Sequence, residues 1–131
     1  MELSLKNRNA IVCGSTQGIG EASAIELANL GANVTLIARN ESKLLDVLND
    51  LDTSKGQTHS FIAIDFRDSE KLKEEVNLLK SSYHILVNNT GGPAAGPIAD
   101  ANTDSFEEAF RMHLINNLIL VQKVVEGMKK E

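Results

Sequence analysis

The sequence predicts an α/β fold in which a parallel sheet is covered by helices on both faces, a doubly wound sheet of strand order 3-2-1-4. Two observations predict it. Short apolar runs alternate with helical segments along the 131 residues, as in βαβ units. The first of these runs enters a turn with three glycines, Gly14-Ser15-Thr16-Gln17-Gly18-Ile19-Gly20, and leaves it as a helix. A chain of this length is sufficient for one domain with a core.

The predicted strands are the apolar runs that precede turns or polar residues. They cover residues 10–13, 33–38, 60–64 and 85–88. Between the fourth strand and the last helix, residues 90–97 are rich in glycine and proline and predict an irregular, mobile loop.

The predicted helices lie between these strands. The first begins near Ile19 and stops at Gly31, and a second follows a cap at Asn40. A third spans about 69–79, and a long last helix runs from about Thr103 to the end. One face of the first helix carries Ile19, Ala22, Ser23, Glu26, Leu27 and Leu30.

Composition excludes several classes of function. A formal net charge of −5 disfavours nonspecific binding to nucleic acid or to an anionic membrane. No apolar run reaches the length of a membrane span, and the first residues do not form a secretory leader. The single cysteine, Cys13, cannot form an internal disulfide, and no Cys/His cluster suggests a metal site. We expect a cytoplasmic protein without a metal, a nucleic-acid partner or a membrane partner.

The glycine turn predicts a cradle for phosphate groups. Gly14 permits the tight turn, Gly18 lets the backbone approach a pyrophosphate, and Gly20 allows the helix and strand to pack closely. The amino end of the helix then presents its N–H groups and dipole to the phosphates. A purely structural turn is the alternative. A P-loop is disfavoured, because no Gly-Lys-Ser/Thr follows.

Residues at the ends of the second and third strands predict which dinucleotide binds. NAD-binding folds place an acid after the second strand, but here Ala38 and Arg39 occupy that position. An arginine there pairs with a 2′-phosphate, so NADP is favoured over NAD, although a solvated arginine is the alternative. After the third strand, Asp65 and Phe66 are candidates to contact adenine. Asp65 could equally be a turn or cap acid.

These residues together resemble the N-terminal half of a short-chain dehydrogenase/reductase. The glycine turn, Arg39, Asp65 and the run Asn88-Asn89-Thr90-Gly91 follow the family's order along essentially the whole chain. The resemblance implies a Rossmann-type sheet whose C-terminal part is missing. It also implies cofactor contacts from Ser15, Gln17 and Ile19, and a lining of the adenosine ribose by Asn89, Thr90 and Gly91.

The sequence also departs from the family. Cys13 replaces a threonine, Thr90 an alanine, and His113 stands at the catalytic asparagine, with Asn116 and Asn117 close behind. His113 is therefore a weak catalytic candidate, and a hydrogen-bonded core histidine is the alternative.

The family's catalytic Tyr-x-x-x-Lys pair is absent. The single tyrosine, Tyr83, is followed four residues later by Val87. We therefore expect the catalytic half, with the contacts to a small carbonyl or alcohol substrate, to lie outside this sequence, and this chain alone to be inactive.

Three hypotheses of function remain at this level. The first is the cofactor-binding half of an NADP-dependent oxidoreductase, the second a naturally short nucleotide-binding or interaction module, and the third another doubly wound fold such as a flavodoxin-like one. The last helix also carries more apolar surface than one sheet face can cover, which predicts a homo-oligomer through that helix. The residues concerned are Phe110, Leu114, Leu118, Val121 and Val125.

Overall fold

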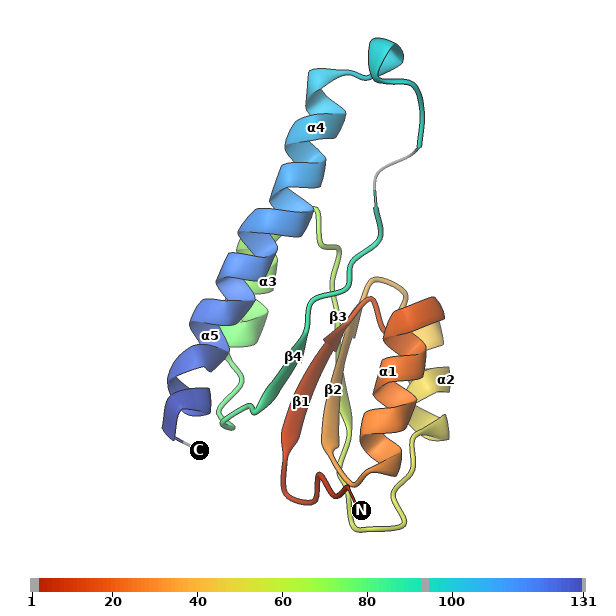
Figure 1. The fold of residues 1–131 in the computed structure, drawn as a ribbon, viewed down its shortest axis with the longest axis vertical. Helices are drawn as coiled ribbons and strands as arrows, with labels where there is room; N and C mark the ends of the chain where they lie inside the picture. Colours follow the sequence, from red (N-terminus) through yellow and green to blue (C-terminus); the bar gives the residue numbers. More distant parts are fainter. Residues whose placement is uncertain (1–2, 93–94, 131) are drawn as a thin grey trace.

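The computed structural model describes residues 3–92 and 95–130, which form a four-stranded parallel sheet flanked by helices (Figure 1). The strand order is β3-β2-β1-β4, and every pairing is parallel, so the predicted fold class and strand order are confirmed. The strands are β1 (Asn9–Cys13), β2 (Asn33–Ala38), β3 (Ser60–Ala63) and β4 (Ile85–Val87). Strands β3 and β4 each end one residue earlier than the sequence predicts, at Ala63 and Val87.

The central strands are apolar because both of their faces are covered. Residues 10–13 of β1 are fully buried, and Ile11 pairs with Thr35 on one side and Leu86 on the other. Side chains alternate between two cores. Ile11 and Ile37 contribute to one core, and Val12 and Leu36 to the other.

Local signals define the first three helices: α1 (Gly18–Asn29), α2 (Glu41–Asp50) and α3 (Ser69–Asn77). The predicted cap of α2 is confirmed, since the Asn40 side chain accepts a hydrogen bond from the Lys43 amide at 3.0 Å. Asp68 caps α3 in the same way. Gly31, with φ +104°, follows the end of α1.

The helices form one layer on each side of the sheet (Figure 1). Helices α1 and α2 cover one face, and α3 packs beside α5 (Asn116–Lys130) on the other. Leu44 of α2 is buried in the core that contains Val12 and Leu36. Leu72 of α3 and Leu120 of α5 are buried in the core that contains Ile11 and Ile37.

Helix α1 packs through a different face from the one that the sequence pattern indicated. Its buried residues are the small Gly20, Ala24 and Ala28, whereas Ile19 is 75% exposed. Small side chains let the helix backbone approach the sheet closely, so the larger residues are left to the periphery.

The last helical segment is continuous in direction but not uniform. It begins as α4 (Thr103–Phe110), passes through a π-helical turn at Arg111–Ile115 and continues as α5. A short 3₁₀ turn, Ile98–Asp100, precedes it. The described parts of the predicted irregular loop, residues 90–92 and 95–97, contain no helix or strand, while Pro93 and Ala94 lie outside the described residues.

Candidate nucleotide-binding site

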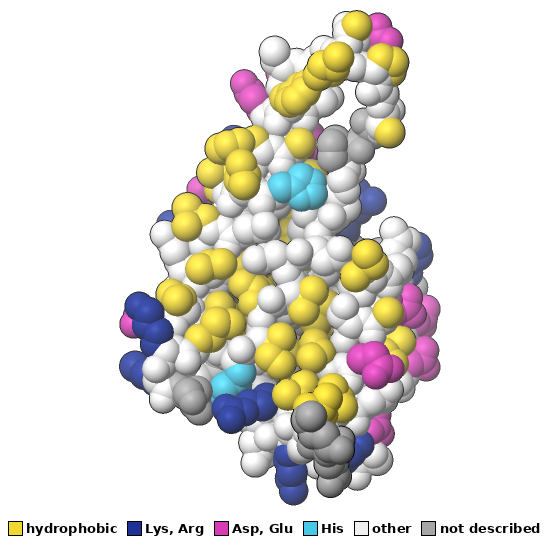
Figure 2. All heavy atoms as spheres, in the orientation of Figure 1, with side chains coloured by type: hydrophobic (Ala, Val, Ile, Leu, Met, Phe, Trp, Pro, Cys, Tyr) yellow, Lys and Arg dark blue, Asp and Glu magenta, His cyan; other side chains and the backbone are white. Residues whose placement is uncertain are grey.

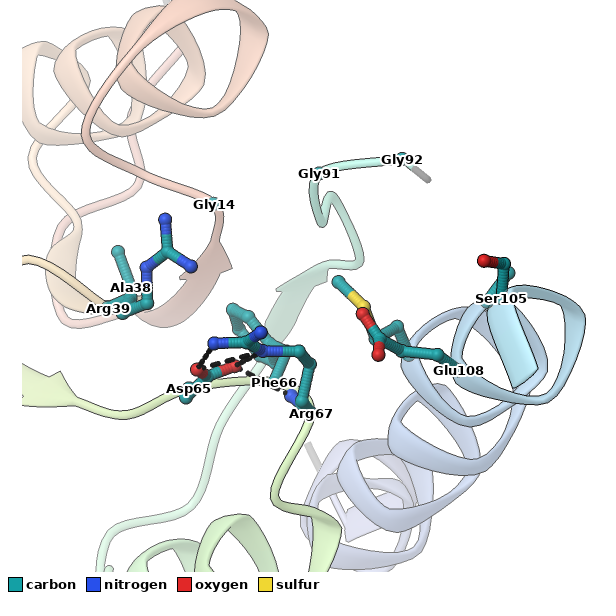
Figure 3. A pocket seen from close by; sticks show the side chains of 12 residues that line it. Gly14, Ala38, Arg39, Asp65, Phe66, Arg67, Gly91, Gly92, Ser105 and Glu108 are labelled. Carbon is teal, nitrogen blue, oxygen red and sulfur yellow. Dashed lines mark hydrogen bonds and ion pairs between the residues drawn. The ribbon is translucent and has the colours of Figure 1, made fainter. Parts of the chain in front are cut away.

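The carboxyl ends of the strands meet at a cavity of about 450 Å³, which is a size typical of ligand pockets (Figure 3). Among the predicted site residues, it is lined by Gly14, Arg39, Asp65, Phe66 and Gly91. Four separate loops supply these residues, and the parallel sheet brings them to one edge. The remaining lining residues are Ala38, Arg67, Gly92, Ser105, Glu108, Ala109 and Met112.

The three glycines of the turn serve two different steric purposes. A Cβ on Gly14 would lie 2.1 Å from the Asn89 carbonyl oxygen, and one on Gly20 would lie 2.1 Å from the Gly14 carbonyl oxygen. These two glycines allow the turn, helix α1 and strand β4 to touch. Gly18, by contrast, has φ +58° and open space around it, so a ligand can approach its backbone.

The first turn of α1 is open to an anion. Gln17 occupies the N-cap position in an extended conformation, and its side chain makes no capping hydrogen bond within the described chain. The helix dipole therefore points at the glycine turn without a local side-chain acceptor.

Ser15 adds a buried polar group to this turn. It is fully buried, and its hydroxyl is the one buried side-chain polar atom without a hydrogen-bond partner among the described residues. Together with the open backbone at Gly18 and the uncapped helix end, this orphaned hydroxyl fits a site for a phosphate-bearing cofactor.

Arg39 extends into the cavity from the end of β2 (Figure 3). Its guanidinium makes no hydrogen bond or ion pair with any residue that the structure describes. Because Ala38 has no carboxylate, the charge at the end of β2 is the positive charge of Arg39. Such a position suits a phosphate better than a ribose hydroxyl.

Asp65 is paired with a residue that the sequence analysis missed. Nη2 of Arg67 donates to Oδ2 of Asp65 at 2.6 Å, and Nε donates to both carboxylate oxygens at 3.0 Å (Figure 3). These hydrogen bonds lower the pKa of Asp65 to about 2, so its carboxylate is ionised at neutral pH. The spacing of an acid and an arginine two residues apart was the available sequence signal.

Asn89 joins strand β4 to the glycine turn. Its Nδ2 donates to the carbonyl oxygens of Cys13 and Gly14, at 3.4 and 3.5 Å. The neighbouring Cys13 thiol is buried, and burial raises its pKa to about 12, which makes it a packing residue and not a nucleophile.

The two remaining departures from the family pattern contact each other. The Thr90 hydroxyl lies 3.1 Å from Nδ1 of His113, which links the end of β4 to the π-helical turn. His113 is half-buried, so it lies at the border of the site and not inside the core. π-Helical turns occur frequently at functional sites.

Asn116 has a structural role that the sequence did not reveal. It is fully buried, accepts a hydrogen bond from the Ser69 hydroxyl at 2.7 Å, and donates from Nδ2 to the carbonyl oxygen of Phe66. These bonds fasten the Asp65–Phe66 loop to the start of α5. Asn116 therefore positions the side of the cavity that Asp65 and Phe66 line.

The other predicted residues lie next to the cavity and do not line it. Ser15 is inside the turn, whereas Gln17, Gly18 and Ile19 are exposed at the amino end of α1. Away from this edge, His59 and His84 accept hydrogen bonds from the amides of Val34 and Asn9 through Nδ1, as expected of structural residues beside strands.

The described residues contain no cluster of His, Cys, Asp and Glu that could hold a metal ion. None of the helices in residues 3–92 and 95–130 has the length and apolarity needed to cross a membrane.

Comparison with known sequences identifies the family of the chain. Residues 8–131 match the model of the short chain dehydrogenase family. The chain is 28% identical to mouse 3-ketodihydrosphingosine reductase over 98% of its own length and 41% of that protein. It is 39% identical to an Arabidopsis thaliana tropinone reductase homolog over 79% of its length and 40% of the relative. A human protein named inactive hydroxysteroid dehydrogenase-like protein 1 is 35% identical over 92% of this chain and 38% of that protein.

Solved structures show the same architecture. The L-sorbose reductase of Gluconobacter frateurii, in complex with NADPH and L-sorbose, superposes with a TM-score of 0.87 and 26% identity, over 99% of this chain and 51% of that one. A putative short-chain alcohol dehydrogenase of Sinorhizobium meliloti gives a TM-score of 0.85 at 26% identity, over 99% and 52%. The chain thus spans about half the length of these proteins or somewhat less. From its glycine turn to its last helix, it belongs to the short-chain dehydrogenase family.

Proposed function

We propose that the chain is the NADP(H)-binding part of a cytoplasmic short-chain oxidoreductase that transfers a hydride between NADP(H) and a small carbonyl or alcohol substrate. The observation that carries the choice of NADP is Arg39, which lines the cavity at the strand end where NAD-binding folds place an acid and has no partner among the described residues. The NADPH bound to the similar L-sorbose reductase supports the same choice. The single cysteine, Cys13, is buried and has no second cysteine with which to pair, which is consistent with a reducing compartment.

Each part of the site has a task in this proposal. The backbone at Gly14 and Gly18 and the open end of α1 receive the pyrophosphate. Arg39 pairs with the 2′-phosphate, and Asp65 and Phe66 border the adenine. Asn89, Thr90 and Gly91 flank the ribose at the end of β4. The nicotinamide, when bound, supplies the hydride chemistry, and the chain's own residues bind and orient the dinucleotide.

Replacing Arg39 by aspartate is expected to invert the cofactor preference. The substitution removes a charge-assisted pair to the 2′-phosphate and adds repulsion, so binding of NADPH weakens by about 1.5–3 kcal/mol, or roughly 10- to 150-fold. Binding of NADH is retained or improved, because the new carboxylate can accept hydrogen bonds from ribose hydroxyls. Dissociation constants for both cofactors, from calorimetry, measure the effect.

The matched control is Lys73→Asp, which makes the same change of charge on an exposed position of α3, away from the cavity. It is expected to leave the ratio of the two dissociation constants unchanged. Equal affinity of the unaltered protein for NADPH and NADH would contradict the proposed specificity.

A second candidate function is a nucleotide-binding module without catalysis. The observation that favours it is the absence of Tyr-x-x-x-Lys, combined with a relative that is itself named inactive. Both functions need the same cofactor site. Hydride transfer by the complete gene product, monitored through the absorbance of the reduced nicotinamide, distinguishes them.

We also propose that the protein forms a homo-oligomer through the exposed side of α4 and α5. Phe106, Phe110, Leu114 and Leu118 are each more than half exposed and follow one another at helical spacing, with Val121 beyond them. Figure 2 shows hydrophobic side chains at the surface along this helix and over the neighbouring sheet edge. That edge is β4, whose one pairing within residues 3–92 and 95–130 is with β1.

Introducing a charge on this helix is expected to dissociate the oligomer. Phe110→Glu would bury an unpaired carboxylate against the second copy, a change that costs several kcal/mol at an interface. Sedimentation of the complete gene product at micromolar concentrations should then show a monomer. Leu45→Glu, at an exposed leucine of α2, is the matched control and should leave the assembly intact. A monomeric unaltered protein would contradict the proposal.

A further inference from the structure

Four charged side chains line the cavity, and two of them, Asp65 and Arg67, form an ion pair. Arg67 holds both carboxylate oxygens of Asp65, and Arg39 lines the same cavity without a partner among the described residues (Figure 3). The side chain of Arg67 is 53% exposed, so it lies at the surface of the cavity and is not part of the core.

Asp65 is the natural competitor for Arg39. The positive charge of Arg39 contributes to the lowered pKa of Asp65, which places the two groups within electrostatic reach of each other. If Asp65 were not already paired, its ionised carboxylate would attract Arg39 and repel any phosphate entering the cavity. Glu108, on α4, adds a second negative charge to the lining and also interacts with Arg67.

We propose that Arg67 is a second determinant of cofactor choice, which keeps Asp65 occupied and thereby leaves Arg39 free for the 2′-phosphate. This inference rests on the proposed NADP-binding function and extends it to a residue outside the strand-end positions. Arg67 contacts the carboxylate and acts on the phosphate through it, so it is a positioning residue. Its geometry suits the role, because a guanidinium can engage both oxygens of one carboxylate at once.

The test measures dissociation constants for NADPH and NADH in the complete gene product and in four variants: Arg67→Gln, Asp65→Asn, the double variant with both changes, and Lys73→Gln as a control on exposed α3. Arg67→Gln is expected to weaken NADPH binding roughly three- to fivefold, the upper part of the range for an exposed charged pair, and to change NADH binding less than twofold. The double variant should bind NADPH within twofold of Asp65→Asn alone, because Arg67 has no carboxylate left to occupy. Lys73→Gln should match the unaltered protein for both cofactors.

The rescue by Asp65→Asn separates shielding from other roles of Arg67. If the double variant binds NADPH more weakly than Asp65→Asn alone, Arg67 acts on the nucleotide directly and the proposal is overturned. An equal loss for NADPH and NADH, or no loss for either, overturns it as well. If the unaltered protein prefers NADPH and Arg39→Asp abolishes the preference while Arg67→Gln leaves the dissociation constant for NADPH unchanged, this inference fails and the proposed function stands. Absence of any preference in the unaltered protein rejects both.

Discussion

Replacing Gly20 by alanine is expected to destabilise the fold by about 3 kcal/mol and to abolish dinucleotide binding. The added Cβ would lie 2.1 Å from the Gly14 carbonyl oxygen and 2.8 Å from Nδ2 of Asn89. Two backbone segments must therefore separate, which we expect to cost about 4 kcal/mol, somewhat above the usual range for overpacking. The helix preference of alanine over glycine offsets only about 1 kcal/mol of this. Separation of the turn from α1 also removes the alignment of the helix end with the phosphates.

Gly18→Ala is the matched control, because it tests backbone strain without a steric clash. Gly18 has φ +58° and no atom within reach of an added Cβ, so the expected cost is about 1–2 kcal/mol. Urea unfolding monitored by circular dichroism gives both free energies of unfolding, and the slope reports whether the transition remains two-state. Similar midpoints for the two variants would show that the Gly20 contact relaxes easily, contrary to the argument.

The architecture and one edge of the site could be predicted because their signals are local. Apolar runs of strand length, a glycine turn and Asn40 as a helix cap are each recognisable within a few residues. A topological rule then places Arg39 and Asp65 at the same edge, since parallel strands end on one side. The structure brings both residues to one cavity, as this rule requires.

The missed features depend on contacts between distant segments. Asn116 holds the Phe66 carbonyl across 50 positions, and the Thr90 and His113 side chains meet across 23. The hydrophobic periodicity of a sequence does not indicate which residues far apart along the chain contact each other. The packing face of α1 was misjudged for a related reason. The sequence pattern placed the large side chains of Ile19 and Leu27 on the packing face of α1. Because α1 lies close to the sheet, the small side chains of Ala24 and Ala28 are the ones buried there. The π-helical turn at 111–115 likewise follows no sequence rule for helices.

Tyr83 is the one tyrosine of the chain, and its position decides whether it can serve as the general acid of carbonyl reduction. Its side chain is 6% exposed and belongs to the core between the sheet and α5. Its hydroxyl lies 3.4 Å from the Thr35 hydroxyl, in a buried contact. A phenol in this position cannot reach a substrate oxygen at the carboxyl edge of the sheet, so it has no access to the proton transfer that carbonyl reduction needs.

The polypeptide of residues 1–131 is therefore expected to turn over carbonyl or alcohol substrates no faster than its Tyr83→Phe variant. Without a positioned general acid, hydride transfer loses roughly 10²–10⁴ in rate, even when the dinucleotide is bound. The measurement is the loss of reduced nicotinamide absorbance in polypeptide of confirmed mass. Calorimetry on the same sample should detect NADPH binding. This control shows that a lack of turnover does not result from a lack of bound cofactor. Turnover that persists in Tyr83→Phe and disappears in His113→Ala would instead assign the acid to the π-helical turn, where Thr90 orients the imidazole.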